Sequence, residues 1–376
     1  MPNRRLASLI GTLLLATPAF AQLQDGGLAR RASLGVALAP DDRGTKVTAV
    51  TPGSAADTNG IRSGDVITAI DGAAVRVPGE LIARVARHAG GETVRLDLLR
   101  DGLRETRSFA LGTLPRETLP GVTFEYGAVT LSDGSRLRTI VSRPDGVRAR
   151  RPAVFLVTGG GCGSIDTPLT PDLAQPGLVR AVAARDFVTM RVEKSGVGDS
   201  TGPPCAEIGY QQELEGYRAA LAALMRDPGV DTRHVFLLGV SLGGLFAPVL
   251  AAETPVQGIV AYGTISFIPT PYPGRSDRFF REVASLDLAG AWSSVSSPVL
   301  VLHGQFDEST SADDAAKVAA FVNARHPGRA THTEFEGLDH CWTRHPSMEA
   351  SRGHCGSGQP VSTLADAVIA FLRRYS

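Results

Sequence analysis

The chain of 376 residues carries 38 Lys or Arg and 38 Asp or Glu side chains, so its formal net charge at pH 7 is zero. Hydrophobic residues make up 43% of it, which excludes a mostly disordered protein and is enough for two domains with their own cores. The arginines are scattered rather than clustered, which argues against nucleic acid or an anionic membrane surface as the main partner.

Residues 1–21 have the pattern of a secretory signal peptide. Arg4 and Arg5 precede an apolar stretch from Leu6 to Ala16, and Ala19-Phe20-Ala21 fits the A-x-A cleavage pattern. A membrane anchor is the alternative, but the apolar stretch is shorter than the roughly 18 to 20 residues that a spanning helix needs. We therefore expect a periplasmic or secreted protein with no stable membrane insertion after signal cleavage.

The sequence of residues 33–112 predicts a small α+β domain of short strands, turns and two helices. Strand patterns occur at Leu34–Leu38 and Lys46–Val50, and a helix pattern runs from Gly79 to His88. The run from Thr51 to Gly72, with its turn, short helix and Gly-Asp-Val-Ile strand, resembles a PDZ domain of the bacterial type.

The PDZ resemblance implies a binding site for a polypeptide C-terminus. In that family a loop of backbone N–H groups receives the peptide's carboxylate, while the peptide adds a strand to the edge of the sheet. The matching positions here are Leu34, Gly35 and Val36. The alternative is that this domain packs on its neighbour and binds no free peptide.

Residues 113–121 contain two prolines and predict a linker to a second domain at 122–376. There the pattern begins with a hairpin across Asp133-Gly134 and then alternates strands with helices, which is typical of a mainly parallel sheet with helices on both faces. The expected core strands are Ala153–Val157, Val188–Val192, Val235–Leu238, Gly258–Tyr262 and Val299–Leu302, with helices at Gly177–Ala184 and Gln211–Met225.

The most informative motif is Gly239-Val240-Ser241-Leu242-Gly243. The pattern predicts a short core strand before it and a small-residue helix after it, which is the context of a G-x-S-x-G nucleophile elbow. Ser241 is therefore predicted to lie on a tight strand-to-helix turn that lifts its hydroxyl above the sheet. The flanking glycines fit, because such a turn has no room for larger residues at those positions.

A serine nucleophile needs a base and a group that orients the base. Asp307 ends the His-Gly-x-x-Asp run after the Val299–Leu302 strand, and His340 follows 33 residues later. This order of Ser, acid and His resembles the α/β-hydrolase family over residues 122–376. The resemblance implies that Ser241 is the nucleophile, His340 the general base and Asp307 the carboxylate that orients it.

Other residues could take the roles of Asp307 and His340, and the role of a short cap in this domain is open. Asp313 or Asp314 would replace Asp307, and His345 or His354 would replace His340, if the assignments are wrong. A short cap at about 264–297 contains several aromatic side chains, which either line an acyl pocket or seal the cap onto the body.

The oxyanion of a tetrahedral intermediate needs backbone donors that are fixed before the reaction. The resemblance implies the amide of Leu242 as one donor and an amide of Gly160 or Gly161 as the second. Thr158 stands where the family usually has a histidine, so the resemblance does not decide which of the two glycine amides points inward. A phosphate-binding loop is the rival interpretation, but the required Lys-Ser or Lys-Thr ending is missing.

Four cysteines in an exported protein suggest two disulfides, and three pairings are possible. The hydrolase resemblance favours Cys162 with Cys205 and Cys341 with Cys355, because each pair would join segments near the catalytic face. A zinc site at the last two cysteines and their neighbouring histidines is the alternative, but the spacing fits none of the usual zinc patterns.

These observations predict a secreted serine hydrolase that cleaves an ester, or else a thioester or peptide bond, through an acyl-enzyme and without cofactor or metal. Its partners would be a small acyl-ester or peptide substrate and a polypeptide C-terminus at the PDZ-like domain. The alternative function is an inactive hydrolase-like adaptor that binds peptide C-termini.

Overall fold

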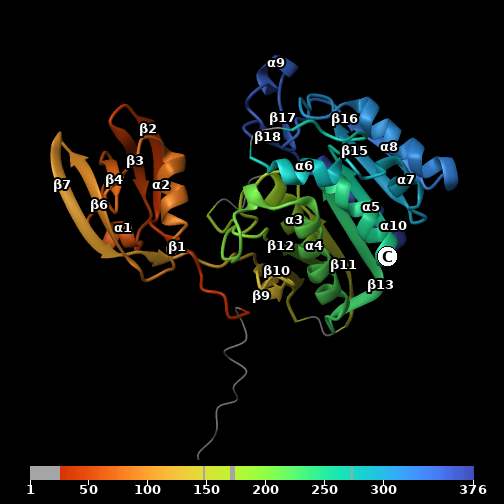
Figure 1. Ribbon diagram of the computed structural model, residues 1–376, viewed down its shortest axis with the longest axis horizontal. Coiled ribbons are helices and arrows are strands. Elements are labelled where there is room, and N and C mark those ends of the chain that lie inside the picture. Colours follow the sequence, from red (N-terminus) through yellow and green to blue (C-terminus); the bar gives the residue numbers. More distant parts are fainter. Residues whose placement is uncertain (1–25, 147–148, 170–173, 272–273) are drawn as a thin grey trace, which may run out of the picture.

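The computed structural model describes residues 26–146, 149–169, 174–271 and 274–376. The predicted signal peptide at 1–21 lies outside the described residues. Two domains are visible in Figure 1, a small one in orange and a larger one from yellow to blue. No helix in the described part of the chain is both long and apolar enough to cross a bilayer.

The small domain is a six-stranded antiparallel sheet with order β2-β3-β4-β6-β7, in which β5 also pairs with β4, and a helix packs against it. The alternate residues Val94, Leu96 and Leu98 of one strand are buried in its core together with Leu81 of the helix. Its elements are β1 Ala32–Ser33, β2 Val36–Asp41, β3 Gly44–Val50, α1 Ala55–Thr58, β4 Val66–Ile70, β5 Ala73–Ala74, α2 Pro78–Val85, β6 Thr93–Arg100, β7 Leu103–Ala110 and β8 Gly112–Thr113.

The large domain is built on an eight-stranded sheet with order β9-β10-β12-β11-β13-β14-β15-β16. The first two pairings, β9 with β10 and β10 with β12, are antiparallel, and all the others are parallel. The strands are β9 Val122–Thr130, β10 Arg136–Pro144, β11 Arg151–Val157, β12 Val188–Val192, β13 Val230–Val240, β14 Gly258–Tyr262, β15 Val299–Gly304 and β16 Ala330–Phe335.

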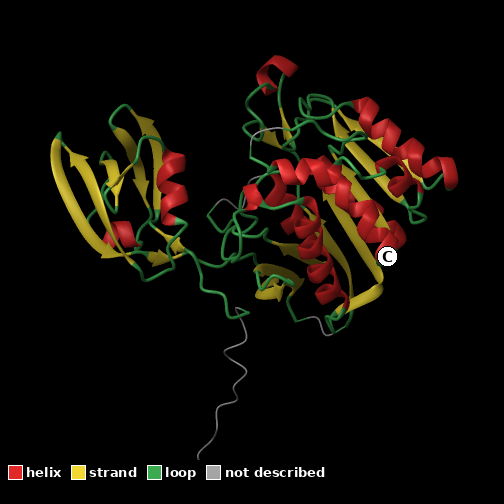
Figure 2. Ribbon diagram, viewed as in Figure 1, coloured by secondary structure: helices red, strands yellow, loops and turns green. Residues whose placement is uncertain are grey.

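Both faces of this sheet are covered by helices, as Figure 2 shows. Ala153, Phe155 and Val157 of β11 pack into one core cluster, whereas Val154 and Leu156 pack into another on the opposite face. This double burial explains the continuous apolar runs of the central strands. One face carries α4 Tyr210–Met225, α5 Gly243–Glu253, α6 Asp277–Val283, α7 Leu288–Ser293 and α8 Ala312–Arg325; the other carries α3 Ala174–Ala183 and α10 Ser362–Tyr375.

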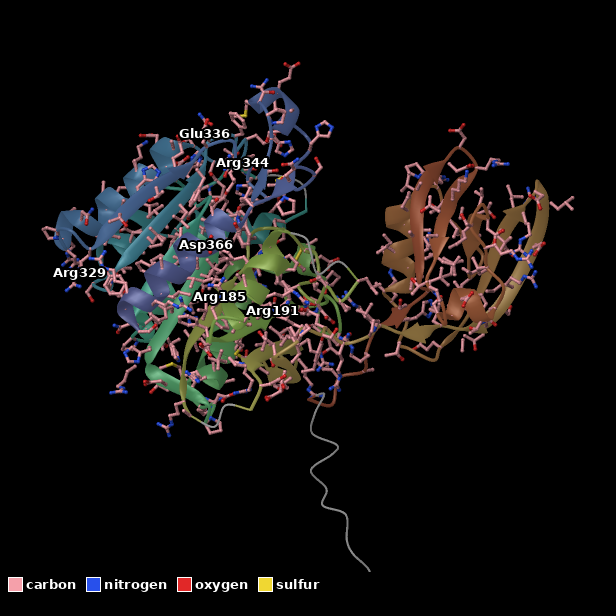
Figure 3. All side chains as sticks on the ribbon, turned by 180° about the vertical axis from the view of Figure 1, so that it is seen from behind. Arg185, Arg191, Arg329, Glu336, Arg344 and Asp366 are labelled. Atoms are coloured by element: carbon pink, nitrogen blue, oxygen red, sulfur yellow. A yellow bond between two sulfur atoms is a disulfide. The ribbon has the colours of Figure 1, made fainter. Side chains whose placement is uncertain are left out.

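The second face is the one turned to the viewer in Figure 3, where Asp366 marks α10 in front of the sheet. On the first face, the cap residues Phe279, Phe280 and Trp292 are buried in the core cluster. They therefore pack the cap onto the body of the domain. The chain also forms the short elements β17 Thr343–Arg344, α9 Met348–Ser351 and β18 Gln359–Pro360, and a 3-10 turn at Cys205–Glu207.

The segment before the small domain is anchored on the large one by buried charges, which the sequence did not reveal. The Arg30 Nη1 atom lies 2.5 Å from Asp166 Oδ2 and 2.6 Å from Asp199 Oδ2. The backbone N–H of Arg31 also donates to Asp199, at 2.8 Å. Strand β1 follows directly, so these ion pairs fix where the small domain begins relative to the large one.

Candidate active site

Ser241 lies at the turn between β13 and α5, with the backbone conformation that an elbow requires. Its φ is +53°, a left-handed value that costs a non-glycine residue energy. The surrounding packing holds it there: its N–H donates to Tyr262 O at 2.9 Å, and its carbonyl accepts from Gly244 N at 3.0 Å. A Cβ on Gly243 would lie 2.3 Å from Val157 O, so only glycine fits directly after Leu242.

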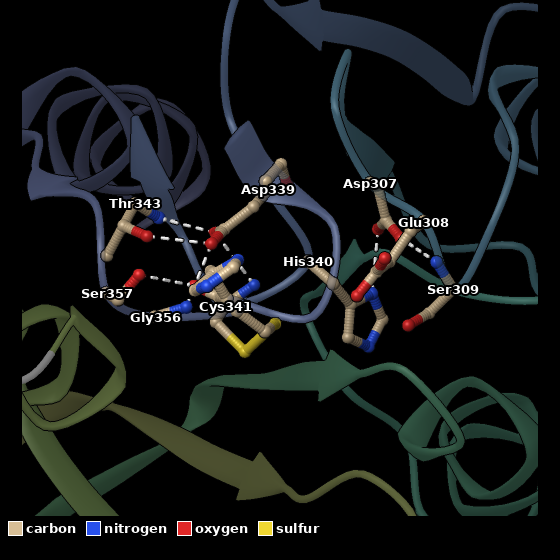
Figure 4. Close-up of a disulfide and its surroundings, with 12 residues drawn as sticks. Asp307, Glu308, Ser309, Asp339, His340, Cys341, Thr343, Gly356 and Ser357 are labelled. Atoms are coloured by element: carbon tan, nitrogen blue, oxygen red, sulfur yellow. Dashed lines mark hydrogen bonds and ion pairs between the residues drawn. A yellow bond between two sulfur atoms is a disulfide. The ribbon is translucent and has the colours of Figure 1, made fainter. Parts of the chain in front are cut away.

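Asp307 lies in the loop after β15 and makes a direct contact with His340. Its Oδ2 lies 2.7 Å from His340 Nδ1, and the two side chains face each other in Figure 4. The carboxylate also accepts the N–H groups of Ser309 and Thr310 and the hydroxyl of Thr310, each at 2.8 Å. Burial would raise the pKa of Asp307, but these bonds, led by that from His340, hold the pKa below its ordinary value. The carboxylate is therefore ionised beside the imidazole.

The residues on both sides of His340 are fixed by a second buried carboxylate, Asp339. Its oxygens accept the N–H groups of Cys341, Thr343 and Gly356 at 3.0, 2.7 and 2.8 Å. Cys341 is in turn joined to Cys355 by a disulfide (Figure 4). The loop that carries His340 is thus held by the hydrogen bonds of Asp339 and by the disulfide, in addition to the contact between His340 and Asp307.

The four alternative residues all make other contacts. His345 bonds to Asp339 at 3.0 Å, and the exposed His354 bonds to the backbone carbonyl of Arg352. Asp314 caps α8, and the exposed Asp313 pairs with Lys317 on the same helix. None of them makes a hydrogen bond to Asp307 or His340 in the described part of the chain.

Ser241 and His340 both line one cavity of about 520 Å³ at the carboxyl ends of the central strands. No hydrogen bond joins the Ser241 hydroxyl to the imidazole among the described residues, and such bonds often form only when substrate is present. Gly263 makes room for the imidazole, since its φ is +53° and an added Cβ would lie 2.9 Å from the His340 ring. The sequence did not single out this glycine.

The loop that follows β11 forms the wall of the cavity beside Ser241. Gly159, Gly160, Gly161 and Gly163 all line it, and a Cβ on Gly159 would come within 3.0 Å of the Ser241 Cβ. Leu242, the other predicted donor, is the buried N-cap residue of α5. The structure therefore brings the three residues predicted to supply oxyanion donors, Leu242, Gly160 and Gly161, to the surroundings of Ser241.

The cysteines pair as the sequence predicted, Cys162 with Cys205 and Cys341 with Cys355. The first disulfide ties the glycine-rich loop to the segment before α4. The second ties the histidine loop to the segment before β18, and both of its cysteines line the cavity. Because these sulfurs are bonded to each other, they are not thiolate ligands for zinc, which was the alternative interpretation.

A second cavity, about 240 Å³ in volume, lies between the start of β2 and helix α2 of the small domain, and Leu169 of the large domain also lines it. Leu34, Gly35 and Val36 line it on one side, and Leu81 and Ile82 line it on the other. Gly35 has a φ of +80°, and an added Cβ would lie 2.2 Å from the Ser54 Cβ. The predicted carboxylate loop thus lies at an apolar groove and depends on glycine.

Comparison with known proteins finds relatives of different kinds. Residues 32–111 match the PDZ domain family. A probable periplasmic serine endoprotease of the DegP-like kind from Rhizobium meliloti is 42% identical over 65 residues, which are 17% of this chain and 13% of that protein. The chain spans between 9% and 30% of the length of five curated relatives that it matches.

Solved structures match the large domain instead. Est1E from Butyrivibrio proteoclasticus, solved with ferulic acid bound, superposes with a TM-score of 0.52 at 15% identity and covers 66% of this chain and 98% of that one. An esterase from Pyrococcus furiosus superposes with a TM-score of 0.50 at 13% identity and covers 69% and 96%. At these identities the likeness shows the fold. The chain therefore carries a PDZ domain at residues 32–111, followed by a domain with the α/β-hydrolase fold.

Proposed function

We propose that this protein is a serine hydrolase that cleaves an ester through an acyl-enzyme. The observation that supports this most is the 2.7 Å contact between Asp307 and His340 at a cavity that Ser241 also lines. A cavity of about 520 Å³ is in the range that holds a small molecule. Similarity in fold to proteins described as esterases is consistent with this function.

In the proposed reaction, Ser241 Oγ attacks the carbonyl carbon of the ester while His340 Nε2 takes the hydroxyl proton. Asp307 keeps Nδ1 protonated, so that Nε2 is free to accept. The tetrahedral intermediate expels the alcohol, which receives the proton from His340. Water then attacks the acyl-enzyme by the same steps and releases the acid and free Ser241.

Covalent labelling tests this proposal. A fluorophosphonate probe should label the wild-type protein at Ser241 and should leave the Ser241→Ala variant unlabelled. An unlabelled wild-type protein would show that the hydrolase proposal is wrong. A panel of p-nitrophenyl esters and aminoacyl amides then identifies the bond, since cleavage of the amides alone would indicate a peptidase.

We further propose that the groove of the PDZ domain binds a polypeptide C-terminus. The groove between the Gly35 loop and α2 supports this. The same groove would also serve an inactive adaptor, which is the competing function for the whole chain. An adaptor would bind peptides in this groove, but its Ser241 would not react with the probe.

Titration of a peptide that ends in an apolar residue should show binding that is lost when its terminal carboxylate is amidated. Ile82 is exposed on α2, so Ile82→Asp should leave the fold intact. The added carboxylate should weaken peptide binding about tenfold, which corresponds to about 1.4 kcal/mol. Equal affinity for the acid and the amide would contradict a C-terminal binding site.

The protein is proposed to act outside the cytoplasm. Two disulfides join its four cysteines, and such bonds persist in oxidising compartments. A DegP-like relative of its PDZ domain is described as periplasmic.

A further inference from the structure

The glycine-rich loop beside Ser241 rests on a buried group of charged side chains that comes from three separate segments. Lys194 follows β12, Glu213 belongs to α4 and Arg275 precedes α6. Their side chains are 5%, 3% and 1% exposed. Lys194 Nζ lies 2.9 Å from Glu213 Oε1, and Arg275 pairs with the other carboxylate oxygen.

The two cations of this group contact consecutive carbonyl groups of the loop. Lys194 Nζ donates to Gly159 O at 2.5 Å, and Arg275 Nη1 donates to Gly160 O at 3.4 Å. The loop is also held at Thr158, whose hydroxyl bonds to Tyr217 at 2.7 Å. None of the three charged residues lies among the described residues that line the cavity, so they contact the loop from behind.

Because the peptide bond is planar, the orientation of each contacted carbonyl group determines where the N–H of the next residue points. The described peptide bonds are all trans, and in a trans peptide the C=O and the following N–H point in opposite directions. When Lys194 draws the Gly159 carbonyl backwards, the N–H of Gly160 is turned towards the cavity. Arg275 has the same effect on the N–H of Gly161, through a longer contact.

We propose that Lys194 is a positioning residue for the oxyanion site, which fixes the Gly159–Gly160 peptide so that the Gly160 N–H faces the oxygen formed during attack by Ser241. This inference rests on the proposed hydrolase function. The shorter contact, from Lys194, fixes the Gly160 N–H, and the longer contact, from Arg275, fixes the Gly161 N–H less firmly. The sequence left open which of these two amides points inward.

The charge of the group supports the same role. Burial would raise the pKa of Glu213, but Lys194 and Arg275 hold it below its ordinary value, so the carboxylate is ionised. Burial also lowers the pKa of Lys194, and the Glu213 carboxylate 2.9 Å away opposes this shift; with Lys194 protonated, the three side chains hold two cations and one anion. Fixed charges in a site shielded from water stabilise a developing oxyanion more strongly than they would in water.

The decisive variant is Lys194→Met, which removes the donor and the charge but leaves Glu213 and Arg275 as a neutral pair. We expect kcat for the best ester to fall about 100-fold, as when one oxyanion donor is lost, with KM changed less than about threefold. Affinity for a trifluoromethyl ketone analogue, which forms a tetrahedral oxyanion on the serine, should fall by a similar factor. Lys317→Met, at an exposed lysine on α8, is the matched control and should change neither quantity.

Thermal unfolding separates positioning from a structural role. If Lys194→Met binds the ester more weakly, as shown by a raised KM, and also has a lowered Tm, the lysine merely supports the fold and the inference is wrong. If the variant keeps wild-type kcat and analogue affinity, the inference is also wrong. Should Lys194→Met fail to fold, the same measurements on Lys194→Gln decide, with the same two outcomes. Failure of the hydrolase proposal itself would look different, because the wild-type protein would then turn over no ester.

Discussion

Replacement of Asp307 by Asn is expected to lower kcat about 10⁴-fold with little change in KM, as in serine hydrolases where the orienting carboxylate becomes an amide. The carboxylate is fully buried and touches His340 at 2.7 Å. An Asn side chain can present an N–H to Nδ1, which favours the tautomer with the proton on Nε2. That tautomer cannot accept the proton of Ser241.

Steady-state kinetics and the rate of fluorophosphonate labelling should both show this loss. Asp313→Asn is the matched control, because Asp313 is exposed on α8, pairs with Lys317 and should be silent in both assays. An Asp307→Asn variant that retains more than about a tenth of wild-type kcat would remove Asp307 from the proposed triad.

The same substitution should change how stability depends on pH. The pKa of Asp307 is lower in the folded chain than in the unfolded one, so the folded state binds fewer protons in the window between the two pKa values. This stabilisation is present above the unfolded pKa of about 4 and is lost as pH falls through the folded pKa. The Asn variant should lack it.

The sequence carried enough information for the elements of the fold and for the proposed triad. Continuous apolar runs such as that of β11 mark strands buried on both faces, and their spacing with helices indicated a parallel sheet. Ser241, Asp307 and His340 each stand at the end of a strand-like segment, and parallel strands bring such ends to one edge. Patterns within short stretches of the sequence therefore predicted a site whose residues lie far apart in the chain.

The buried charged group behind the glycine-rich loop could not be predicted in this way. Lys194, Glu213 and Arg275 come from segments up to 81 residues apart, and no sequence pattern links the three. A single charged residue in a sequence is normally exposed, so the pattern gave no sign that these three are buried together. The same reason explains why the ion pairs of Arg30 with Asp166 and Asp199 were missed, since they join the segment before the small domain to the large domain.

Gly243→Ala is expected to destabilise the large domain by about 3 kcal/mol, a value at the upper end of the usual cost of overpacking. The added Cβ would lie 2.3 Å from Val157 O. That oxygen belongs to the backbone of β11, which pairs with β13 at Gly239, so it cannot swing aside as the end of a flexible side chain would. The turn itself must shift.

A shift of this turn moves Ser241 and the Leu242 amide together, so we expect the proposed ester hydrolysis to disappear in Gly243→Ala even below its Tm. The fall in Tm should be about 6 to 12 °C, measured by scanning calorimetry on the transition of the large domain. Gly177→Ala is the control: Gly177 lies in α3 with nothing near the added Cβ, and Ala favours a helix by up to about 1 kcal/mol. Equal Tm values for the two variants would show that the elbow is not packed as tightly against β11 as the structure indicates.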